Sequence, residues 1–174
     1  MKSKMSKITK VGVMCALSVV LIAFIHFPIL PNAPFLEYDP ADIPLIFIGF
    51  LYGPLYGIAA TIIVSVIQGI TVSAGSGWVG IVMHIIATGA LVLVSSILYK
   101  KRQRLVLPLI LGSLARILVM IPSNLFFTVK FWGMPYDAVV AMLPTAIIPF
   151  NIIKAVINSL IVAILFKRLA NLIK

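Results

Sequence analysis

Acidic residues are scarce in this sequence, which holds 4 Asp and Glu against 14 Lys and Arg in 174 residues. Charged residues of both signs make up only 10% of the chain, whereas hydrophobic residues make up 62% and the mean hydropathy is +1.20. Globular domains carry charge on about 25% of their residues. The composition therefore excludes a soluble domain and predicts an integral membrane protein.

Cysteine and catalytic motifs are also scarce. The one cysteine, Cys15, lies in an apolar run, so no intrachain disulfide can form and no redox or metal motif can be argued. The chain has no G-x-x-x-x-G-K phosphate loop, no H-E-x-x-H and no G-x-S-x-G. No acid is expected within a membrane segment, because Asp39 and Asp42 fall in a proline-rich loop where a paired geometry cannot be assumed. The sequence thus predicts no catalytic residue, no metal ligand and no ATP hydrolysis through a phosphate loop.

Six apolar segments predict an all-α integral membrane protein, a bundle of six transmembrane helices that forms one domain over residues 1–174. They cover residues 10–30, 43–52, 55–72, 78–99, 105–129 and 144–166. The first segment is preceded by lysines, as in a signal peptide. It is followed by prolines rather than by a small-residue cleavage site, so we expect it to remain as a transmembrane helix. The second is too short to cross about 30 Å of hydrocarbon upright. It must start earlier or lie among other helices.

The distribution of basic residues predicts the topology. The N-terminal tail, the turn between the fourth and fifth segments and the C-terminal tail hold 11 of the 14 Lys and Arg, whereas all 4 acids fall in the opposite loops. Basic clusters at segment ends suit the headgroups of a lipid bilayer rather than nucleic acid. The positive-inside rule predicts a multi-pass protein of the cell membrane with both termini cytoplasmic.

A proline-rich stretch at residues 28–44 separates the first two segments. It holds 5 of the 11 prolines and 3 of the 4 acids, so we expect an ordered, extended loop outside the hydrocarbon. Phe35 and Leu36 are apolar where a simple tether would be polar. They favour either a lid folded over a pocket or anchoring at the membrane interface.

Polar side chains mark one face of the last segment. Asn151, Lys154 and Asn158 are spaced at i, i+3 and i+7, so they share a helix face. A lysine near the middle of the membrane costs roughly 2.5–3.5 kcal/mol, so we expect this face to line a cavity or meet a partner. The alternative is that Lys154 reaches the headgroups from the end of its segment. In the third segment, Gln68 also needs a partner outside its own helix.

Two further polar residues lie within apolar segments. Arg116 is near the centre of the fifth segment and must pair with carbonyls, a distant acid, a bound anion or another subunit. His84 is interpreted as a hydrogen-bonded residue of the bundle interior, with a ligand or proton relay as the alternative.

These features together resemble a known family. The chain is similar in length and six-segment layout to the substrate-binding S components of energy-coupling factor (ECF) vitamin transporters, most of all to the riboflavin-specific members. The local marks are the basic start, the loop end Asp42-Ile43-Pro44, the turn Gly53-Pro54-Leu55-Tyr56-Gly57 and the run Pro149-Phe150-Asn151-Ile152-Ile153-Lys154.

The resemblance implies a subunit without catalysis that captures a vitamin from outside, with riboflavin expected as transported ligand and no cofactor. It implies that Asn124, Asn151 and Lys154 contact the ribityl chain. Phe35 and Leu36 would cover the flat ring.

The resemblance also implies partners: a transmembrane coupling protein and two cytoplasmic ATPases. Family members meet the coupling protein through a pair of small residues on the first helix. Here the pair is Gly12 and Ala16, four residues apart. An alanine-to-alanine pair would run from Ala16 to Val20, so the chain departs from the family pattern at that position.

A second departure keeps other ligands open. Riboflavin members can carry a Lys-Asn pair where this chain has Val64 and Ser65. Gln68 is expected to supply a replacement amide, but a pocket for pantothenate, thiamine or a flavin relative would also fit.

A different class of protein is the competing interpretation. A small membrane enzyme or assembly factor would use His84, Arg116 and Lys154. It would place the polar residues at a cytoplasmic or lateral opening rather than beneath the proline-rich loop.

Overall fold

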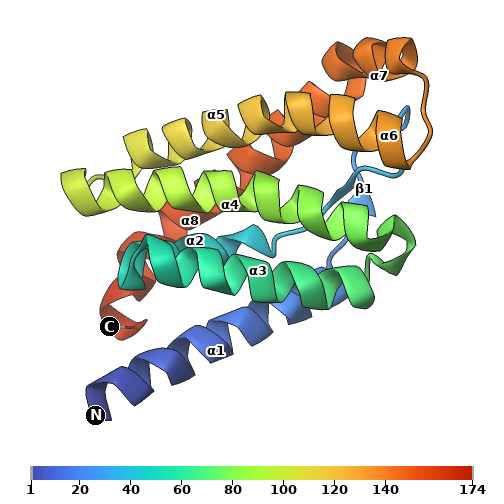
Figure 1. The fold of residues 1–174 in the computed structure, drawn as a ribbon. Coiled ribbons are helices and arrows are strands. Elements are labelled where there is room, and N and C mark those ends of the chain that lie inside the picture. The colour runs from blue at the N-terminus through green and yellow to red at the C-terminus, as the bar shows by residue number, and fades with distance from the viewer. Residues whose placement is uncertain (1, 174) are drawn as a thin grey trace.

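The structure, a computed structural model, describes residues 2–173 and the side chains of residues 6–169. Over this range it is helical apart from one small hairpin, which confirms the all-α class (Figure 1). Four of the described helical stretches are long and apolar enough to cross a membrane, and two shorter apolar helices accompany them. The elements in chain order are α1 (Lys2–Phe24), β1 (Phe27–Pro28), β2 (Glu37–Tyr38), α2 (Asp42–Tyr52), α3 (Pro54–Ile70), η1 (Ala74–Ser76), α4 (Gly77–Arg102), α5 (Val106–Ser123), η2 (Asn124–Thr128), α6 (Val129–Phe131), α7 (Tyr136–Met142), η3 (Leu143–Ile147) and α8 (Ile148–Ile173).

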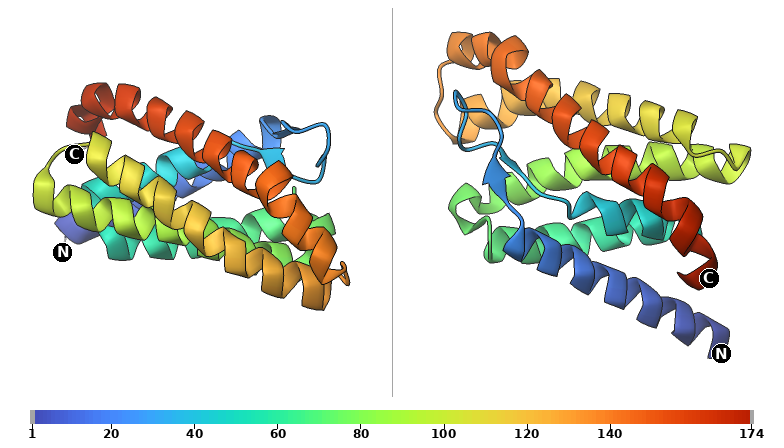
Figure 2. Two further views of the ribbon diagram at one scale, coloured as in Figure 1. Left: turned by 90° about the horizontal axis from the view of Figure 1, so that it is seen from above. Right: turned by 180° about the vertical axis from the view of Figure 1, so that it is seen from behind.

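The two ends of the bundle differ in what they carry. Both ends of the chain and the basic turn between α4 and α5 lie together, and the β1–β2 hairpin and α7 lie at the opposite end (Figure 1, Figure 2). The basic segments are therefore separated from the proline-rich loop by the length of the helices. We call the second end the hairpin end.

The short helix α2 occupies the centre of the bundle. It contacts α1, α3, α4 and α8, and every residue from 42 to 50 is buried. Leu45, Ile46 and Ile48 have no exposed surface. A helix that is apolar all round is stable when other helices surround it. This explains how a segment too short to cross a membrane upright fits in the fold.

The first helix ends earlier than predicted. α1 stops at Phe24, and Phe27 and Pro28 pair antiparallel with Tyr38 and Glu37 instead of extending the helix to residue 30. Proline cannot donate the hydrogen bond that would continue an α-helix. The proline-rich stretch thus contains a hairpin, where only an extended loop was predicted.

Two π-helical turns interrupt the fifth and sixth predicted helices at the hairpin end. The turn η2 joins α5 to α6, and η3 joins α7 to α8. Pro122 precedes η2 and Pro144 lies within η3. Because proline lacks an N–H group, regular α-helical bonding is disturbed at such positions. The last helical stretch begins at Tyr136 rather than at the predicted residue 144.

Gly112 provides a test of the packing between α4 and α5. A Cβ atom at Gly112 would lie 2.7 Å from the Leu91 carbonyl oxygen and 2.9 Å from the Ser95 Cβ. The added methyl group could be accommodated only if the α4 backbone moved. We therefore expect Gly112→Ala to lower the free energy of unfolding by about 1–3 kcal/mol. Gly89→Ala is the control, since its Cβ would meet only Ile58 Cδ1 at 3.7 Å. Thermal unfolding in detergent measures both. Equal stability of the two variants would contradict this packing.

Candidate functional site

A cavity of about 640 Å³ lies at the hairpin end of the bundle, where residues of the hairpin loop and of the turn between α3 and α4 line it. Its volume falls within the range of about 300–1,000 Å³ that is common for small-molecule sites. The hairpin loop, α3, α4, α5 and α8 all contribute to its wall. Each side chain that the sequence predicted for ligand binding lines it: Phe35, Leu36, Gln68, Asn124, Asn151 and Lys154. Their convergence beneath the proline-rich loop is the geometry expected for a solute-binding subunit, whereas their contact with a ligand stays a prediction.

The polar face of α8 is buried along its length. Asn151, Lys154 and Asn158 have 2%, 3% and 0% of their surface exposed. Lys154 Nζ donates a hydrogen bond of 2.6 Å to Asp39 Oδ2. The alternative in which this lysine reaches the headgroups is therefore wrong, because its charge is paired inside the protein.

Asn158 and Tyr38 fasten the hairpin loop to α8. The Tyr38 hydroxyl donates to Asn158 Oδ1 at 2.9 Å, and Asn158 Nδ2 donates to the Asp39 carbonyl and to Asp42 Oδ2, each at 3.3 Å. Burial raises the pKa of the Tyr38 hydroxyl, and the neighbouring Asp39 and Asp42 carboxylates raise it further. This tyrosine therefore remains a donor at neutral pH.

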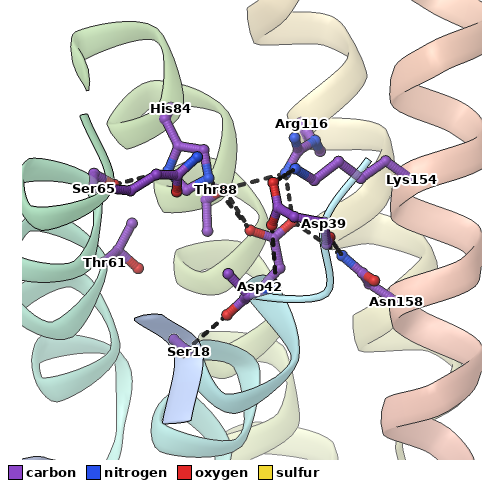
Figure 3. A network of polar contacts seen from close by, with 12 residues as sticks. Ser18, Asp39, Asp42, Thr61, Ser65, His84, Thr88, Arg116, Lys154 and Asn158 are labelled. Atoms are coloured by element: carbon purple, nitrogen blue, oxygen red, sulfur yellow. Dashed lines mark hydrogen bonds and ion pairs between the residues drawn. The ribbon is translucent and has the colours of Figure 1, made fainter. Parts of the chain in front are cut away.

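A second buried ion pair joins α2 to α5. Arg116 Nη1 donates to Asp42 Oδ2 at 2.9 Å and to Thr88 Oγ1 at 3.2 Å, while Arg116 Nε donates to Asn151 Oδ1 at 3.1 Å. The Thr88 hydroxyl donates to Asp42 Oδ1 at 2.9 Å. Figure 3 shows Asp42, Thr88 and Arg116 converging from α2, α4 and α5, beside Asp39 of the loop and Lys154 of α8. Of the partners that sequence allowed for Arg116, the structure selects a distant acid.

The placement of Asp39 and Asp42 corrects the sequence analysis, which expected no acid inside the bundle. They are 3% and 0% exposed. Prolines around them suggested a loop in water, but the loop folds inward and α2 begins at Asp42. The signal that was available is Arg116, because an arginine deep in an apolar helix needs a partner and one of this chain's 4 acidic residues could supply it.

The buried charges at this centre compensate one another. Asp39 pairs with Lys154 and Asp42 pairs with Arg116. Asp39, Asp42 and His84 also bring possible metal-ligating atoms within 4.8 Å of one another. Both carboxylates already bind a protein cation, however, so a metal ion would have to displace an ammonium or a guanidinium group.

His84 and Asn124 are both held by other protein groups. Ser65 Oγ lies 2.8 Å from His84 Nδ1, so the interpretation of His84 as a hydrogen-bonded interior residue is confirmed. Asn124 Nδ2 donates to the Met120 carbonyl at 2.8 Å, and Asn124 Oδ1 accepts from Thr128 at 3.2 Å. Asn124 therefore offers a ligand less free hydrogen-bonding capacity than expected.

Gly12 and Ala16 lie away from this cavity. Both are exposed on α1, and a Cβ atom built at Gly12 would meet nothing within 4 Å. α1 runs along the edge of the bundle (Figure 1). The pair therefore forms an open surface, and its use as an interface stays a prediction.

Apolar membrane-length helices and a solute-sized cavity with a polar wall form the architecture of a membrane protein that binds a small solute. The chain matches the family model described as "ECF transporter, substrate-specific component" over residues 6–166. It therefore belongs to the family of substrate-specific components of ECF transporters, which confirms the resemblance seen in the sequence.

Individual relatives agree with this assignment. The riboflavin transporter RibU of Staphylococcus aureus (strain TCH60) is 28% identical over 97% of this chain and 92% of its own length. The riboflavin transporter FmnP of Bacillus subtilis (strain 168) is 30% identical over 95% of this chain and 93% of its own. The solved structure described as "Structure and mechanism of the S component of a bacterial ECF transporter" has a TM-score of 0.83 and 29% identity, and the match covers 100% of this chain and 99% of that one.

Replacing Arg116 tests the buried ion pair. Arg116→Gln leaves the Asp42 carboxylate, which is fully buried, without its cation, and we expect a loss of about 3–5 kcal/mol in the free energy of unfolding. Adding Asp42→Asn should recover part of this loss, because a neutral amide replaces the unpaired charge. Thermal unfolding of the single and double variants measures the coupling. The exposed Arg104→Gln is the control and should change stability by less than about 0.5 kcal/mol. Additive losses in the double variant would rule out the pairing.

Proposed function

We propose that this chain binds riboflavin in the cavity at the hairpin end and serves as the vitamin-specific subunit of an ATP-driven ECF transporter. The observation that carries the proposal is the convergence of Lys154, Asn151 and Gln68 in one solute-sized cavity beneath the proline-rich loop. The relatives named riboflavin transporters, which match nearly the whole chain, support riboflavin as the ligand.

The charge balance of the cavity suits an uncharged, hydroxyl-rich ligand. The two buried cations, Arg116 and Lys154, are already paired with two carboxylates. A phosphate group on the ligand would therefore have to compete with a carboxylate for either cation. Lys154 uses one of its three N–H donors on Asp39. Its other two N–H groups can donate to ribityl hydroxyls. Asn151 accepts from Arg116 Nε and donates to the Ile147 carbonyl, so its second N–H group and its remaining acceptor lone pair are what it offers the ligand.

The hairpin loop supplies apolar cover for a flat ring system. Phe35 and Leu36 line the cavity, and Phe35 is 58% exposed. A large aromatic side chain at the rim of a cavity gains burial when a ligand binds beneath it. We assign these two residues to the isoalloxazine ring and the α8 face to the ribityl chain.

The proposed arrangement in the membrane follows the charge distribution. All six apolar helices, including short α2 and α3, would form the membrane domain of one multi-pass subunit. The basic end would face the cytoplasm under the positive-inside rule. The cavity would then open outward, and the coupling protein and two ATPases would act from the basic side.

The second candidate for the ligand is another vitamin, because the residues of α3 at positions 64 and 65 differ from those that riboflavin-specific members can carry. Val64 is fully buried and Ser65 is bonded to His84, where riboflavin-specific members can carry a Lys-Asn pair. A cavity without that pair suits pantothenate or thiamine as well as a flavin relative.

Purification without added ligand tests the proposed function. The protein should carry bound flavin, visible by its absorbance and identified by mass spectrometry, because a nanomolar Kd corresponds to about −12 kcal/mol and survives purification. If the protein is empty, titration with a vitamin panel follows. Stoichiometric binding of a different vitamin would keep the transporter role and overturn the specificity. No binding by the folded protein would overturn the binding role.

Bulky residues on α1 test the proposed coupling surface. Gly12→Leu and Ala16→Leu should leave riboflavin affinity in detergent unchanged, because both lie outside the cavity. Uptake into cells should fall by at least about tenfold, since close helix approach depends on small residues. Ala141→Leu, an exposed small residue on α7, is the matched control and should take up vitamin normally. Normal uptake by the α1 variants would show that the coupling protein docks elsewhere.

A further inference from the structure

Two buried polar atoms in the cavity wall have no hydrogen-bond partner among the described residues. They are Gln68 Oε1 and His84 Nε2. Gln68 is only 7% exposed, so bulk water does not reach most of its side chain. Leaving a buried donor or acceptor unpaired costs about 1–3 kcal/mol. Because both residues line the cavity, these unpaired atoms are candidates for contact with a ligand that fills it.

Gln68 offers an acceptor. Its Nε2 donates to Ser73 Oγ at 3.4 Å, and in this orientation Oε1 is the atom without a partner. The next residue, Gly69, packs directly on α4, because a Cβ atom there would lie 2.1 Å from Ile81 Cγ1. The end of α3 that carries Gln68 is thus held firmly against α4.

His84 offers a donor. Its Nε2 lies 3.8 Å from Asp42 Oδ1, and a lone pair on Nε2 would be repelled by the carboxylate. The tautomer with a hydrogen on Nε2 is therefore favoured, and Nδ1 accepts the hydrogen bond from the Ser65 hydroxyl at 2.8 Å. A separation of 3.8 Å is too long for a hydrogen bond to Asp42. The Nε2–H group stays available.

The donor and the acceptor are parts of one arrangement. Ser65 and Gln68 are three residues apart on α3, so they lie on one helix face, and Ser65 holds the imidazole of His84 from α4. Figure 3 shows Ser65 and His84 side by side, across the polar network from Lys154, and all three residues line the cavity. The cavity thus has the unpaired donor and acceptor on the side of α3 and α4, and Asn151 and Lys154 on the side of α8.

We infer that Gln68 and His84 are specificity-determining residues that recognise an amide edge, –C(=O)–NH–, on the ligand. This inference rests on the proposed function, since it assigns one end of the same ligand. The pyrimidine part of a flavin presents such an edge: its N3–H donates to Gln68 Oε1, and a neighbouring carbonyl accepts from His84 Nε2–H. A ligand that satisfies both atoms removes the cost of their burial. One that lacks the N–H group leaves Gln68 unpaired.

The test compares riboflavin with 3-methylriboflavin, in which a methyl group replaces the N3 hydrogen. The wild-type protein should bind the methylated compound at least about tenfold more weakly, the effect of one lost hydrogen bond worth about 1.4 kcal/mol. Equal affinity for the two flavins would overturn the inference without any variant. Failure to bind riboflavin at all would instead overturn the proposed function.

Variants separate the roles of the two residues. Gln68→Leu should bind riboflavin at least about tenfold more weakly and lose most of its preference over 3-methylriboflavin. His84→Phe should weaken both flavins by a similar factor, because both keep the carbonyl. Thr71→Val, an exposed polar residue at the same end of α3 and outside the cavity, is the matched control. A preference that is unchanged in Gln68→Leu would overturn the assignment of Gln68.

Discussion

The neutralisation of Asp42 inside the bundle is the constraint on which the rest of the structure depends. Its carboxylate is fully buried, and Arg116, Thr88 and Asn158 from three different helices donate to it. An uncompensated charge at such a position would cost several kcal/mol. The positions of α4, α5 and α8 around α2 are therefore tied to one anion, and the same helices form the wall of the cavity.

The loop that covers the cavity is part of its polar centre rather than a separate lid. Asp39, on that loop, binds Lys154 of α8, and Tyr38 binds Asn158 one turn further on. A ligand that attracts the Lys154 ammonium therefore also acts on the residue that anchors the loop. Ligand recognition and the position of the loop therefore both depend on the orientation of the Lys154 ammonium group.

Periodicity and composition predicted the helical class and the polar face of α8, because lipid leaves few roles for polar side chains within apolar segments. The family resemblance added Asn124 and the ring-covering roles of Phe35 and Leu36, and these residues also line the cavity. Neither the sequence pattern nor the resemblance predicted that Asp39 and Asp42 are buried. Local prolines suggest an exposed loop, and the partners of these acids lie more than one hundred residues away in some cases, as for Asp39 and Lys154 with a separation of 115 residues. Such pairings depend on tertiary packing. Arg116 nevertheless indicated that a partner was needed, and a distant acid was one of the possibilities.

The separation in sequence between the loop and α8 has a consequence for biosynthesis. Tyr38 and Asn158 are 120 residues apart, and Asp39 and Lys154 are 115 apart. During synthesis, the loop emerges from the ribosome long before either partner exists. Asp39, whose cation is Lys154 of α8, must stay hydrated until α8 has entered the membrane, because a buried carboxylate without a partner is costly. The contacts that hold the hairpin loop over the cavity therefore form only after α8 has been made.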